Sequence, residues 1–245
     1  MTSVLPYNDV AAAERFFKKT KDLAGVIVEP VAANMGVVPA TPGFLETLKK
    51  GAARSGALLI FDEVISGFRL RYGGAQHLYG ISPDLTVLGK VIGGGLPVGA
   101  FGGAKRFMDH LVPNGAVYQA GTLSGNPLSM VAGQSVLSAL NAAFYSRLNA
   151  RTEDFVDQMR TILTRRGHTA AVQSVGSMFT VFFGKKKVWN FTDVQNSDKE
   201  KFRRFFRHMI QRGVYVPPSA FEASFVSAAH GEHELKKTLE VVRQF

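Results

Sequence analysis

Two short apolar runs, each followed by a charged residue, constrain the fold of this chain more than any other feature. Residues 58–61 run into Asp62, and residues 85–88 are followed by Gly89 and Lys90. Runs that are apolar at successive positions are typical of parallel strands buried on both faces of an α/β sheet. Because the carboxyl ends of parallel strands meet at one edge of a sheet, we expect Asp62 and Lys90 to lie at the same edge.

The sequence on either side continues the pattern of an α/β fold. Asn8 or Asp9 is expected to cap a helix, and residues 24–28 are expected to form a buried strand. Thr41 and Pro42 indicate the start of a second helix before the next strand. A strand, a helix and a strand in this order predict a parallel crossover unit.

The pattern changes in the second half of the chain. A helix is expected at residues 152–164, and Ser197 with Glu200 predicts a capping box at the start of another helix. Further strands are expected at residues 172–175, 178–183, 214–216 and 221–227. We therefore expect residues 1–150 to form part of a large domain with a mostly parallel sheet, and residues 151–245 to form a smaller α+β domain.

Composition excludes several classes of function. The chain has no cysteine, which excludes disulfides, thiolate metal sites and a cysteine nucleophile. His230 and His233 lack a third ligand, so no metal site is expected. The amino terminus lacks the pattern of a signal peptide, and no apolar run reaches the roughly 18 residues of a membrane span. We therefore expect a cytoplasmic protein without a membrane partner.

The net charge of +10 has two interpretations. A solvated basic surface is the ordinary one, and binding of nucleic acid is the other. The second is suggested by the basic side chains at residues 185–187, Lys201, Arg203, Arg204 and Arg207. Because most of these side chains share the polar face of an amphipathic helix, without interleaved aromatic residues in a loop, we expect no nucleic-acid partner.

Residues 111–146 contain no charged side chain. Prolines and polar amides interrupt this segment, so it does not suit the interior of a bilayer. An uncharged segment of this length in a soluble protein is usually internal or part of a subunit interface, and we expect one of these two here.

Asp62 and Lys90 have three interpretations. A P-loop ATPase would need a glycine where Asp84 stands and a hydroxyl where Val91 stands, so we discard this one. A structural ion pair is common at strand ends. The third is a site for pyridoxal 5′-phosphate (PLP), which requires a lysine for its aldehyde and a carboxylate that keeps its pyridine nitrogen protonated. A desolvated strand end would favour the uncharged lysine that such chemistry needs.

The flanking residues favour the third interpretation. Residues 60–69 resemble the motif that binds the cofactor nitrogen in class III, fold-type I aminotransferases, and residues 83–100 resemble the lysine motif of the same family. Within this class, residues 29–36, 72–76 and 117–127 look like those of the glutamate-1-semialdehyde 2,1-aminomutases. The resemblance implies the α/β fold of the fold-type I PLP transferases. It also implies an isomerase that converts glutamate-1-semialdehyde into 5-aminolevulinate for tetrapyrrole synthesis.

The resemblance further implies roles for three residues around the cofactor ring. Lys90 would hold the cofactor covalently and move protons, Asp62 would pair with the pyridinium nitrogen, and Val64 would pack against the ring. A valine at this position is an ordinary strand residue about as often as it is a ring contact. The matched flanking residues leave fewer ordinary explanations for Lys90 and Asp62.

Three more residues would lie at the borders of the site. Thr122 would bind the cofactor phosphate of a neighbouring subunit, which implies a homodimer, and Asn34 and Glu222 would lie near the substrate or the ring. Each of these residues also has a structural explanation. Thr122 could cap the following helix, Asn34 could shape its turn, and Glu222 could be a surface charge.

Members of this family are longer, and their amino-terminal segment has no counterpart in this sequence. We therefore expect the chain to correspond to the carboxyl-terminal part of such an enzyme. Its partners would be a small-molecule amino-aldehyde substrate, a second copy of the chain, and a separate amino-terminal half. Another class III aminotransferase is the first alternative function, and a non-catalytic fragment or one half of a complementing pair is the second.

Overall fold

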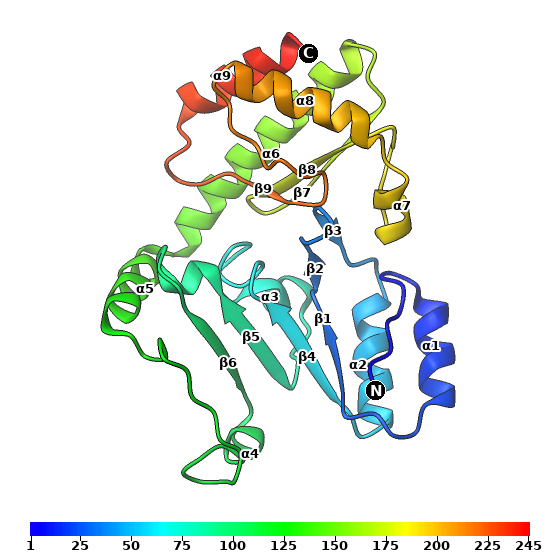
Figure 1. Ribbon diagram of the computed structural model, residues 1–245, viewed down its shortest axis with the longest axis vertical. Helices are drawn as coiled ribbons and strands as arrows, with labels where there is room; N and C mark the ends of the chain where they lie inside the picture. Colours follow the sequence, from blue (N-terminus) through cyan, green and yellow to red (C-terminus); the bar gives the residue numbers. More distant parts are fainter. The chain divides into compact units, whose positions relative to one another are not determined.

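In the computed structural model, which describes residues 1–245, the chain forms two compact units (Figure 1). The first unit comprises Met1–Leu5, Asp9–Pro30 and Pro42–Ala142, and the second comprises Pro6–Asn8, Val31–Thr41 and Ala143–Phe245. The predicted boundary between residues 150 and 151 lies inside a helix, and residues 31–41 belong to the second unit. The chain therefore passes between the two units more than once.

A mostly parallel sheet forms the centre of the first unit. It consists of β1 (Gly25–Val28), β4 (Leu58–Glu63), β5 (Leu85–Gly89) and β6 (Gly99–Gly103), in the order β1-β4-β5-β6. The first three strands are parallel and confirm the expected runs, whereas β6 is antiparallel to β5. Because Asp62 pairs with Val87, the carboxyl ends of β4 and β5 lie at the same edge of the sheet, as predicted.

Helices precede, connect and follow these strands. They are α1 (Val10–Lys19), α2 (Phe44–Arg54), α3 (Gly74–Tyr79), the 3₁₀ turn η1 (Lys90–Gly93), α4 (Lys105–Met108) and α5 (Pro127–Ala139). Asp9 caps α1 by accepting a hydrogen bond from the Ala12 N–H, as predicted. The predicted start of α2 at Thr41 and Pro42 is wrong. Gly43, with φ of +83°, forms a left-handed turn directly before the helix and delays its start.

The strands of this sheet are less buried than their sequence predicts. In β4, Leu59, Phe61 and Glu63 are buried, whereas the residues between them are half-buried. Most of β5 is half-buried, and most of β6 is exposed. The expected burial on both faces is therefore wrong for this chain, because its own elements cover one face of β4 more completely than the other.

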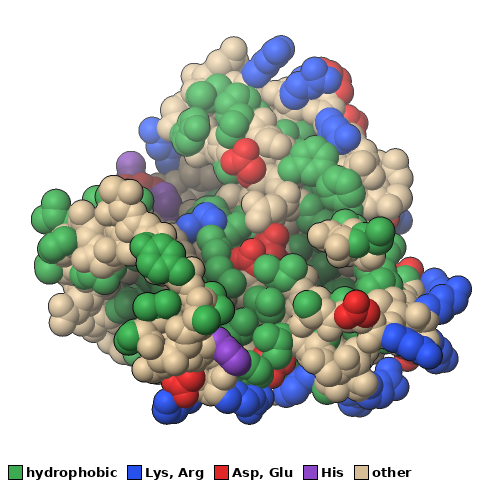
Figure 2. Space-filling model, turned by 60° about the horizontal axis from the view of Figure 1, so that its bottom comes forward, with side chains coloured by type: hydrophobic (Ala, Val, Ile, Leu, Met, Phe, Trp, Pro, Cys, Tyr) green, Lys and Arg blue, Asp and Glu red, His purple; other side chains and the backbone are tan.

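The uncharged segment at residues 111–146 is largely exposed. Leu128 and Val131 of α5 are 72% and 65% exposed, and Tyr118 is 79% exposed. The space-filling view shows hydrophobic side chains over much of the visible face, with many Lys and Arg side chains toward its edges (Figure 2). The expectation that this segment is internal is wrong, and its role in a subunit interface stays a prediction.

The second unit is an α+β arrangement. Its antiparallel sheet contains β7 (Ala170–Val175), β8 (Met178–Phe183) and β9 (Ser224–Phe225), and β2 (Val31–Ala32) forms a separate antiparallel pair with β3 (Val38–Pro39). The helices are α6 (Ala142–Arg165), α7 (Phe191–Gln195), α8 (Lys199–Gln211) and α9 (Glu232–Arg243). All residues of β8 are buried, so this strand lies at the centre of the core.

Two local predictions differ from the structure in this unit. The helix expected at residues 152–164 is the second half of the longer α6, and neither α6 nor any other helix has the apolar stretch needed to cross a membrane. Residues 214–216 form no strand, and the strand expected at residues 221–227 is reduced to β9. Val214 and Val216 pack against the core without strand pairing, so their apolar character reflects burial alone.

The start of α8 also differs from the predicted capping box. Asp198, rather than Ser197, is the capping residue, and its carboxylate accepts a hydrogen bond from the Lys201 N–H at 2.8 Å. The hydroxyl of Ser197 is used elsewhere, because it donates to the Val194 carbonyl oxygen at 2.7 Å. The predicted helix is present, but its cap is one residue later.

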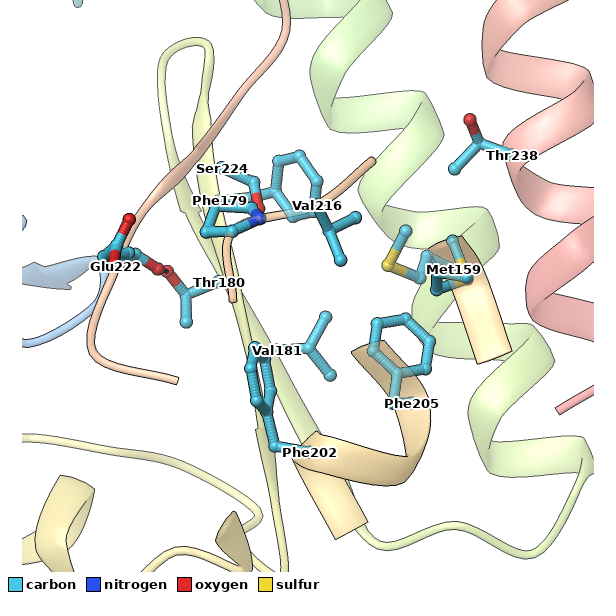
Figure 3. Close-up of a pocket in the computed structure, with 12 residues that line it drawn as sticks. Met159, Phe179, Thr180, Val181, Phe202, Phe205, Val216, Glu222, Ser224 and Thr238 are labelled. Atoms are coloured by element: carbon cyan, nitrogen blue, oxygen red, sulfur yellow. Dashed lines mark hydrogen bonds between the residues drawn. The ribbon is translucent and has the colours of Figure 1, made fainter. Parts of the chain in front are cut away.

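A small cavity lies in the core of the second unit (Figure 3). Its volume is about 30 Å³, and Met159, Val181 and Phe205 are among the side chains that line it. Apolar cavities of this size generally stay dry. We therefore interpret it as a gap in packing rather than a binding site.

Substitution of Thr180 tests whether its side-chain hydrogen bonds stabilise the second unit. Its buried hydroxyl accepts a hydrogen bond from the Val37 N–H at 3.0 Å and donates one to the Glu222 carbonyl oxygen at 3.2 Å. Thr180→Val keeps the shape but leaves both backbone groups without this partner. We expect the free energy of unfolding, measured in urea, to fall by about 1–3 kcal/mol. Thr180→Ser keeps the hydroxyl and is the control, and an equal loss in both variants would contradict this role.

Candidate active site

Lys90 lies where β5 ends and the turn η1 begins. Its backbone has φ of +49°, in the left-handed region that residues with a side chain rarely adopt. Its side chain is exposed, so the predicted desolvated lysine is wrong for this chain. The physical reason is that the lysine borders a wide, open groove at the edge of the sheet.

Asp62 lies on the strand next to the one that leads to the lysine. Its side chain lies on the same face of the sheet as that of Val87, because paired residues of neighbouring strands point to the same side. Its Oδ1 accepts a hydrogen bond from the Val64 N–H at 3.0 Å. The ion pairs of the structure do not join Asp62 to Lys90, so the interpretation of these residues as a structural ion pair is wrong.

The groove beside Lys90 has a volume of about 1540 Å³. Val64, Val87 and Leu88 line it, so it runs along the edge of the sheet at which β4 and β5 end, next to Asp62. Other lining residues come from β6, from residues 121–125 and from α5. Ordinary small-molecule pockets measure about 300–1,000 Å³, so this groove has room for a cofactor together with a substrate.

Unusual backbone conformations occur at this groove. Only three residues other than glycine have positive φ, and two of them, Lys90 and Phe68 (φ of +54°), line the groove. Phe68 contacts Tyr72 edge to face, with 5.5 Å between the ring centroids. Such strained conformations persist only where the surrounding structure holds them, and they are frequent at functional sites. This observation supports the groove as the functional part of the first unit.

Helix α5 packs closely against the turn that contains the lysine. A Cβ atom on Gly133 would lie 2.1 Å from the Ile92 carbonyl oxygen, and one on Gly94 would lie 2.4 Å from the Ala132 carbonyl oxygen. Ser129 of the same helix donates a hydrogen bond to the loop after the turn at 3.1 Å. Only glycine allows these approaches, so the two glycines set the position of the turn.

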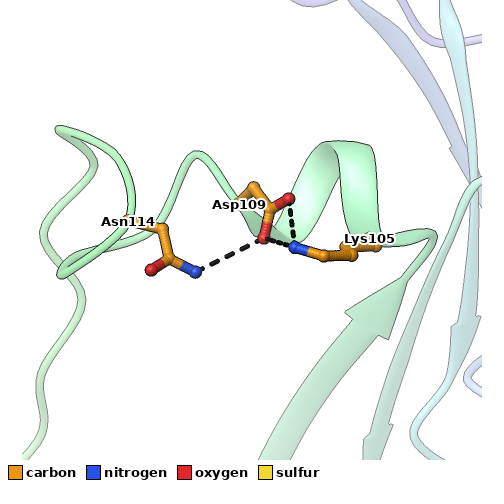
Figure 4. A network of polar contacts seen from close by, with 3 residues as sticks. All are labelled: Lys105, Asp109 and Asn114. Carbon is orange, nitrogen blue, oxygen red and sulfur yellow. Dashed lines mark hydrogen bonds and ion pairs between the residues drawn. The ribbon is translucent and has the colours of Figure 1, made fainter.

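A network of exposed polar contacts lies in the segment that leads to Thr122. Lys105 of α4 donates hydrogen bonds to both carboxylate oxygens of Asp109, and Asn114 donates to the same carboxylate at 3.4 Å (Figure 4). Thr122 lies exposed in the turn that follows. Asn126 caps α5 by accepting from two backbone N–H groups, so the alternative role of Thr122 as the helix cap is wrong.

Asn34 and Glu222 lie on neighbouring segments of the second unit. Asn34 is exposed in the turn between β2 and β3, and the Gly36 N–H of this turn donates to the Phe221 carbonyl oxygen at 2.7 Å. Glu222 is also exposed, and its carbonyl oxygen accepts from the Thr180 hydroxyl. The predicted site residues thus form two sets. The first unit contains Asp62, Val64, Lys90 and Thr122, and the second contains Asn34 and Glu222.

Four residues that line the groove have no periodic signal in the sequence. They are Phe68, Tyr72, Gln119 and Ser124. Each lies in a turn or an irregular segment, where neither the period of a strand nor that of a helix assigns a face. The signal that could have indicated them is their position inside the stretches that resemble the aminotransferase motifs.

Gly133 tests the packing around the lysine turn. In Gly133→Ala the new methyl group would overlap the Ile92 carbonyl oxygen, so the helix or the turn must move. We expect the free energy of unfolding to fall by about 1–3 kcal/mol, as is typical of overpacking. Ser135→Ala, at an exposed position of the same helix, is the control, with an expected change below about 0.5 kcal/mol. Equal stabilities of the two variants in urea would rule out the close approach.

Comparison with known proteins gives a consistent result. The family model described as Aminotransferase class-III matches residues 5–229. Glutamate-1-semialdehyde 2,1-aminomutase from Pelotomaculum thermopropionicum is 52% identical over 244 residues, which cover 99% of this chain and 56% of that protein. The chain therefore spans little more than half the length of this relative.

Solved structures agree with this result. A β-phenylalanine aminotransferase from Variovorax paradoxus superimposes with a TM-score of 0.91 at 30% identity, covering 99% of this chain and 56% of the other. A transaminase with PLP bound superimposes with a TM-score of 0.88 at 30% identity and the same coverage. The fold is that of the fold-type I PLP transferases, as the sequence predicts. The chain belongs to the class III aminotransferase family.

Proposed function

We propose that this chain supplies the lysine-bearing part of a PLP-dependent glutamate-1-semialdehyde 2,1-aminomutase. The observation that carries the proposal is the pairing of β4 with β5. It sets Asp62 beside the strand that leads to Lys90, next to a groove large enough for a cofactor and a substrate. The 52% identity to an aminomutase over nearly the whole chain supports this activity over others of the class.

The residues present suit PLP chemically. Lys90 offers a primary amine at the groove, and the Oδ2 atom of Asp62 remains available because only Oδ1 accepts from the Val64 N–H. A Cβ atom on Gly89 would lie 3.2 Å from Val64 Cγ1, so this glycine keeps the valine close to the lysine. The largely apolar lining of the groove suits one face of a flat aromatic ring.

Each residue of this set would have its own task. Bound PLP would supply an electron sink for the carbanion formed on the substrate. Lys90 would hold the cofactor aldehyde and move a proton to and from the substrate carbon, which its flexible side chain allows. The carboxylate of Asp62 would keep the pyridine nitrogen protonated. Val64 would contact the ring, while its N–H holds the Asp62 carboxylate in place.

The tasks of the remaining residues depend on assembly. Exposed Thr122 would bind the cofactor phosphate in the neighbouring subunit of a homodimer. The exposed apolar side chains of α5, Leu128 and Val131, would then be covered by that subunit. Asn34 and Glu222 would contact the substrate or the ring, which is consistent with their exposure and with their adjacent segments.

Because the chain spans 56% of the aminomutase relative, we propose that turnover needs the remaining amino-terminal part, in the same chain or in a separate one. The substrate would be a small amino-aldehyde, glutamate-1-semialdehyde, converted in the cytoplasm into 5-aminolevulinate for tetrapyrrole synthesis. A second candidate is another class III aminotransferase reaction. The observation behind that candidate is the TM-score of 0.91 to a β-phenylalanine aminotransferase, which shares the fold.

Selective labelling tests the cofactor site. The chain is titrated with PLP, reduced with borohydride and digested for mass spectrometry. We expect weak but selective labelling of Lys90, and no label at that position in Lys90→Ala. Asp62→Asn should weaken the apparent affinity about tenfold, because a neutral amide no longer favours the protonated pyridine nitrogen. Glu46→Gln, which removes an exposed carboxylate of α2, is the control. Label spread evenly over the surface lysines would contradict the proposal.

Turnover tests the substrate. The chain is mixed with the amino-terminal part of the P. thermopropionicum enzyme and supplied with PLP and glutamate-1-semialdehyde. We expect 5-aminolevulinate from the mixture and none from either part alone, because the site would be incomplete in each. Product from this chain alone would show that the missing part is not needed. Amino transfer from β-phenylalanine to a keto acid, without 5-aminolevulinate, would favour the second candidate.

A further inference from the structure

Glu63 is the neighbour of Asp62 on β4 and points to the opposite face of the sheet. Successive residues of a strand alternate between the two faces, so Asp62, which pairs with Val87, and Glu63, which pairs with Leu88, lie on opposite faces of the sheet. Glu63 is fully buried, whereas Asp62 is half-buried. A charged side chain is rarely buried so completely without a partner of opposite charge.

Hydrogen-bond donors, rather than a cation, surround the Glu63 carboxylate. The Ser66 hydroxyl donates at 3.0 Å and the Ala75 N–H at 2.5 Å. Gln76 donates through its backbone N–H at 3.1 Å and through its side-chain amide at 3.2 Å. No ion pair of the structure includes Glu63. The carboxylate is therefore stabilised by donors from a single stretch of chain, residues 66–76.

This stretch forms part of the wall of the groove. Phe68 and Tyr72, whose rings are in edge-to-face contact, both line it. The Gln76 amide also reaches the Thr86 hydroxyl of β5 at 3.3 Å, which ties the same stretch to the second strand of the site. Gly74 is required for this arrangement, because a Cβ atom there would lie 2.3 Å from Glu63 Oε2.

We propose that Glu63 is a positioning residue for the cofactor site. Its carboxylate fixes residues 66–76 to the end of β4 and so holds the Phe68 and Tyr72 wall in place. Through the backbone of β4 it also fixes the orientation of Asp62, the next residue along the strand. One strand end thus carries two carboxylates with separate tasks, because alternation sends them to opposite faces of the sheet and the Glu63 carboxylate binds the stretch that carries the groove wall. This inference rests on the proposed PLP site.

The alternative is that Glu63 only stabilises the fold. Its replacement would then loosen the whole first unit and leave the groove unchanged in molecules that remain folded. A buried substitution of another kind in the same unit would have the same effect. Leu48→Ala is the matched control, because Leu48 is a buried residue of α2 that does not line the groove.

Glu63→Gln is the main test variant. Glutamine keeps the shape of the side chain, but its amide nitrogen is a donor, so one of the two acceptor positions, that facing Ala75 or that facing Gln76, is lost. Ser66→Ala removes only one donor and is a milder second variant that serves if Glu63→Gln does not fold. All measurements are made at a temperature at which circular dichroism shows each variant to be folded.

Hydrogen exchange of the chain without PLP gives the first readout. We expect peptides that cover residues 64–79 to exchange about tenfold faster in Glu63→Gln, because glutamine has one acceptor oxygen and can serve only one of the two backbone amides, Ala75 N–H or Gln76 N–H. The effect should be smaller in Ser66→Ala, which removes a donor but leaves both acceptor oxygens. Peptides from β7 and β8 should not change, and Leu48→Ala should show no selective effect at residues 64–79. Uniform acceleration, or no change at residues 64–79, would overturn the proposal.

Labelling of Lys90 by PLP and borohydride gives the second readout. We expect an apparent affinity about tenfold weaker in Glu63→Gln and within about twofold of the unmodified chain in Leu48→Ala. Equal affinities of these two variants would overturn the positioning role. If the unmodified chain itself is not labelled at Lys90, the proposed function fails instead. The exchange measurement then decides alone whether Glu63 holds the wall.

Discussion

The pairing of β4 with β5 is the constraint on which the candidate site depends. In this register Asp62 lies opposite Val87, so the strand that carries the aspartate and the strand that leads to Lys90 end at one edge. A shift by one residue would send the aspartate side chain to the other face of the sheet. The register of the backbone pairing therefore determines which side chains lie at the edge of the sheet and which face each of them is on.

Close packing then shapes the space around this edge. Gly94 and Gly133 let α5 approach the lysine turn to distances that no side chain would permit. Lys90 and Phe68 adopt left-handed backbone conformations there, which the surrounding contacts must hold. On the face of β4 opposite to Asp62, the buried carboxylate of Glu63 accepts four hydrogen bonds from the segment that forms the groove wall. The site thus depends on both faces of a single strand.

Exposure within the first unit is consistent with the length of the chain relative to its relatives. The chain spans 56% of the aminomutase from P. thermopropionicum. Within it, β6 is largely exposed, and Leu128 and Val131 of α5 present apolar surface that an isolated protein rarely leaves uncovered. Lys90 is exposed as well, because a groove walled from one side does not remove the lysine from water. Apolar runs in the sequence therefore overestimated the burial of these strands.

The sequence by itself determined the strands at residues 58–61 and 85–88, their parallel pairing and the identities of Asp62 and Lys90, because apolar runs and strand-end charges are local signals. It also determined the family, because the flanking motifs match. Only the tertiary structure decided that residues 31–41 join the second unit and that Asp62 and Lys90 form no ion pair. Only the structure showed that Phe68 and Tyr72 line the groove and that the Glu63 carboxylate is buried. The physical reason is that these features arise from contacts between segments distant in sequence and from irregular backbone, for which periodicity carries no information.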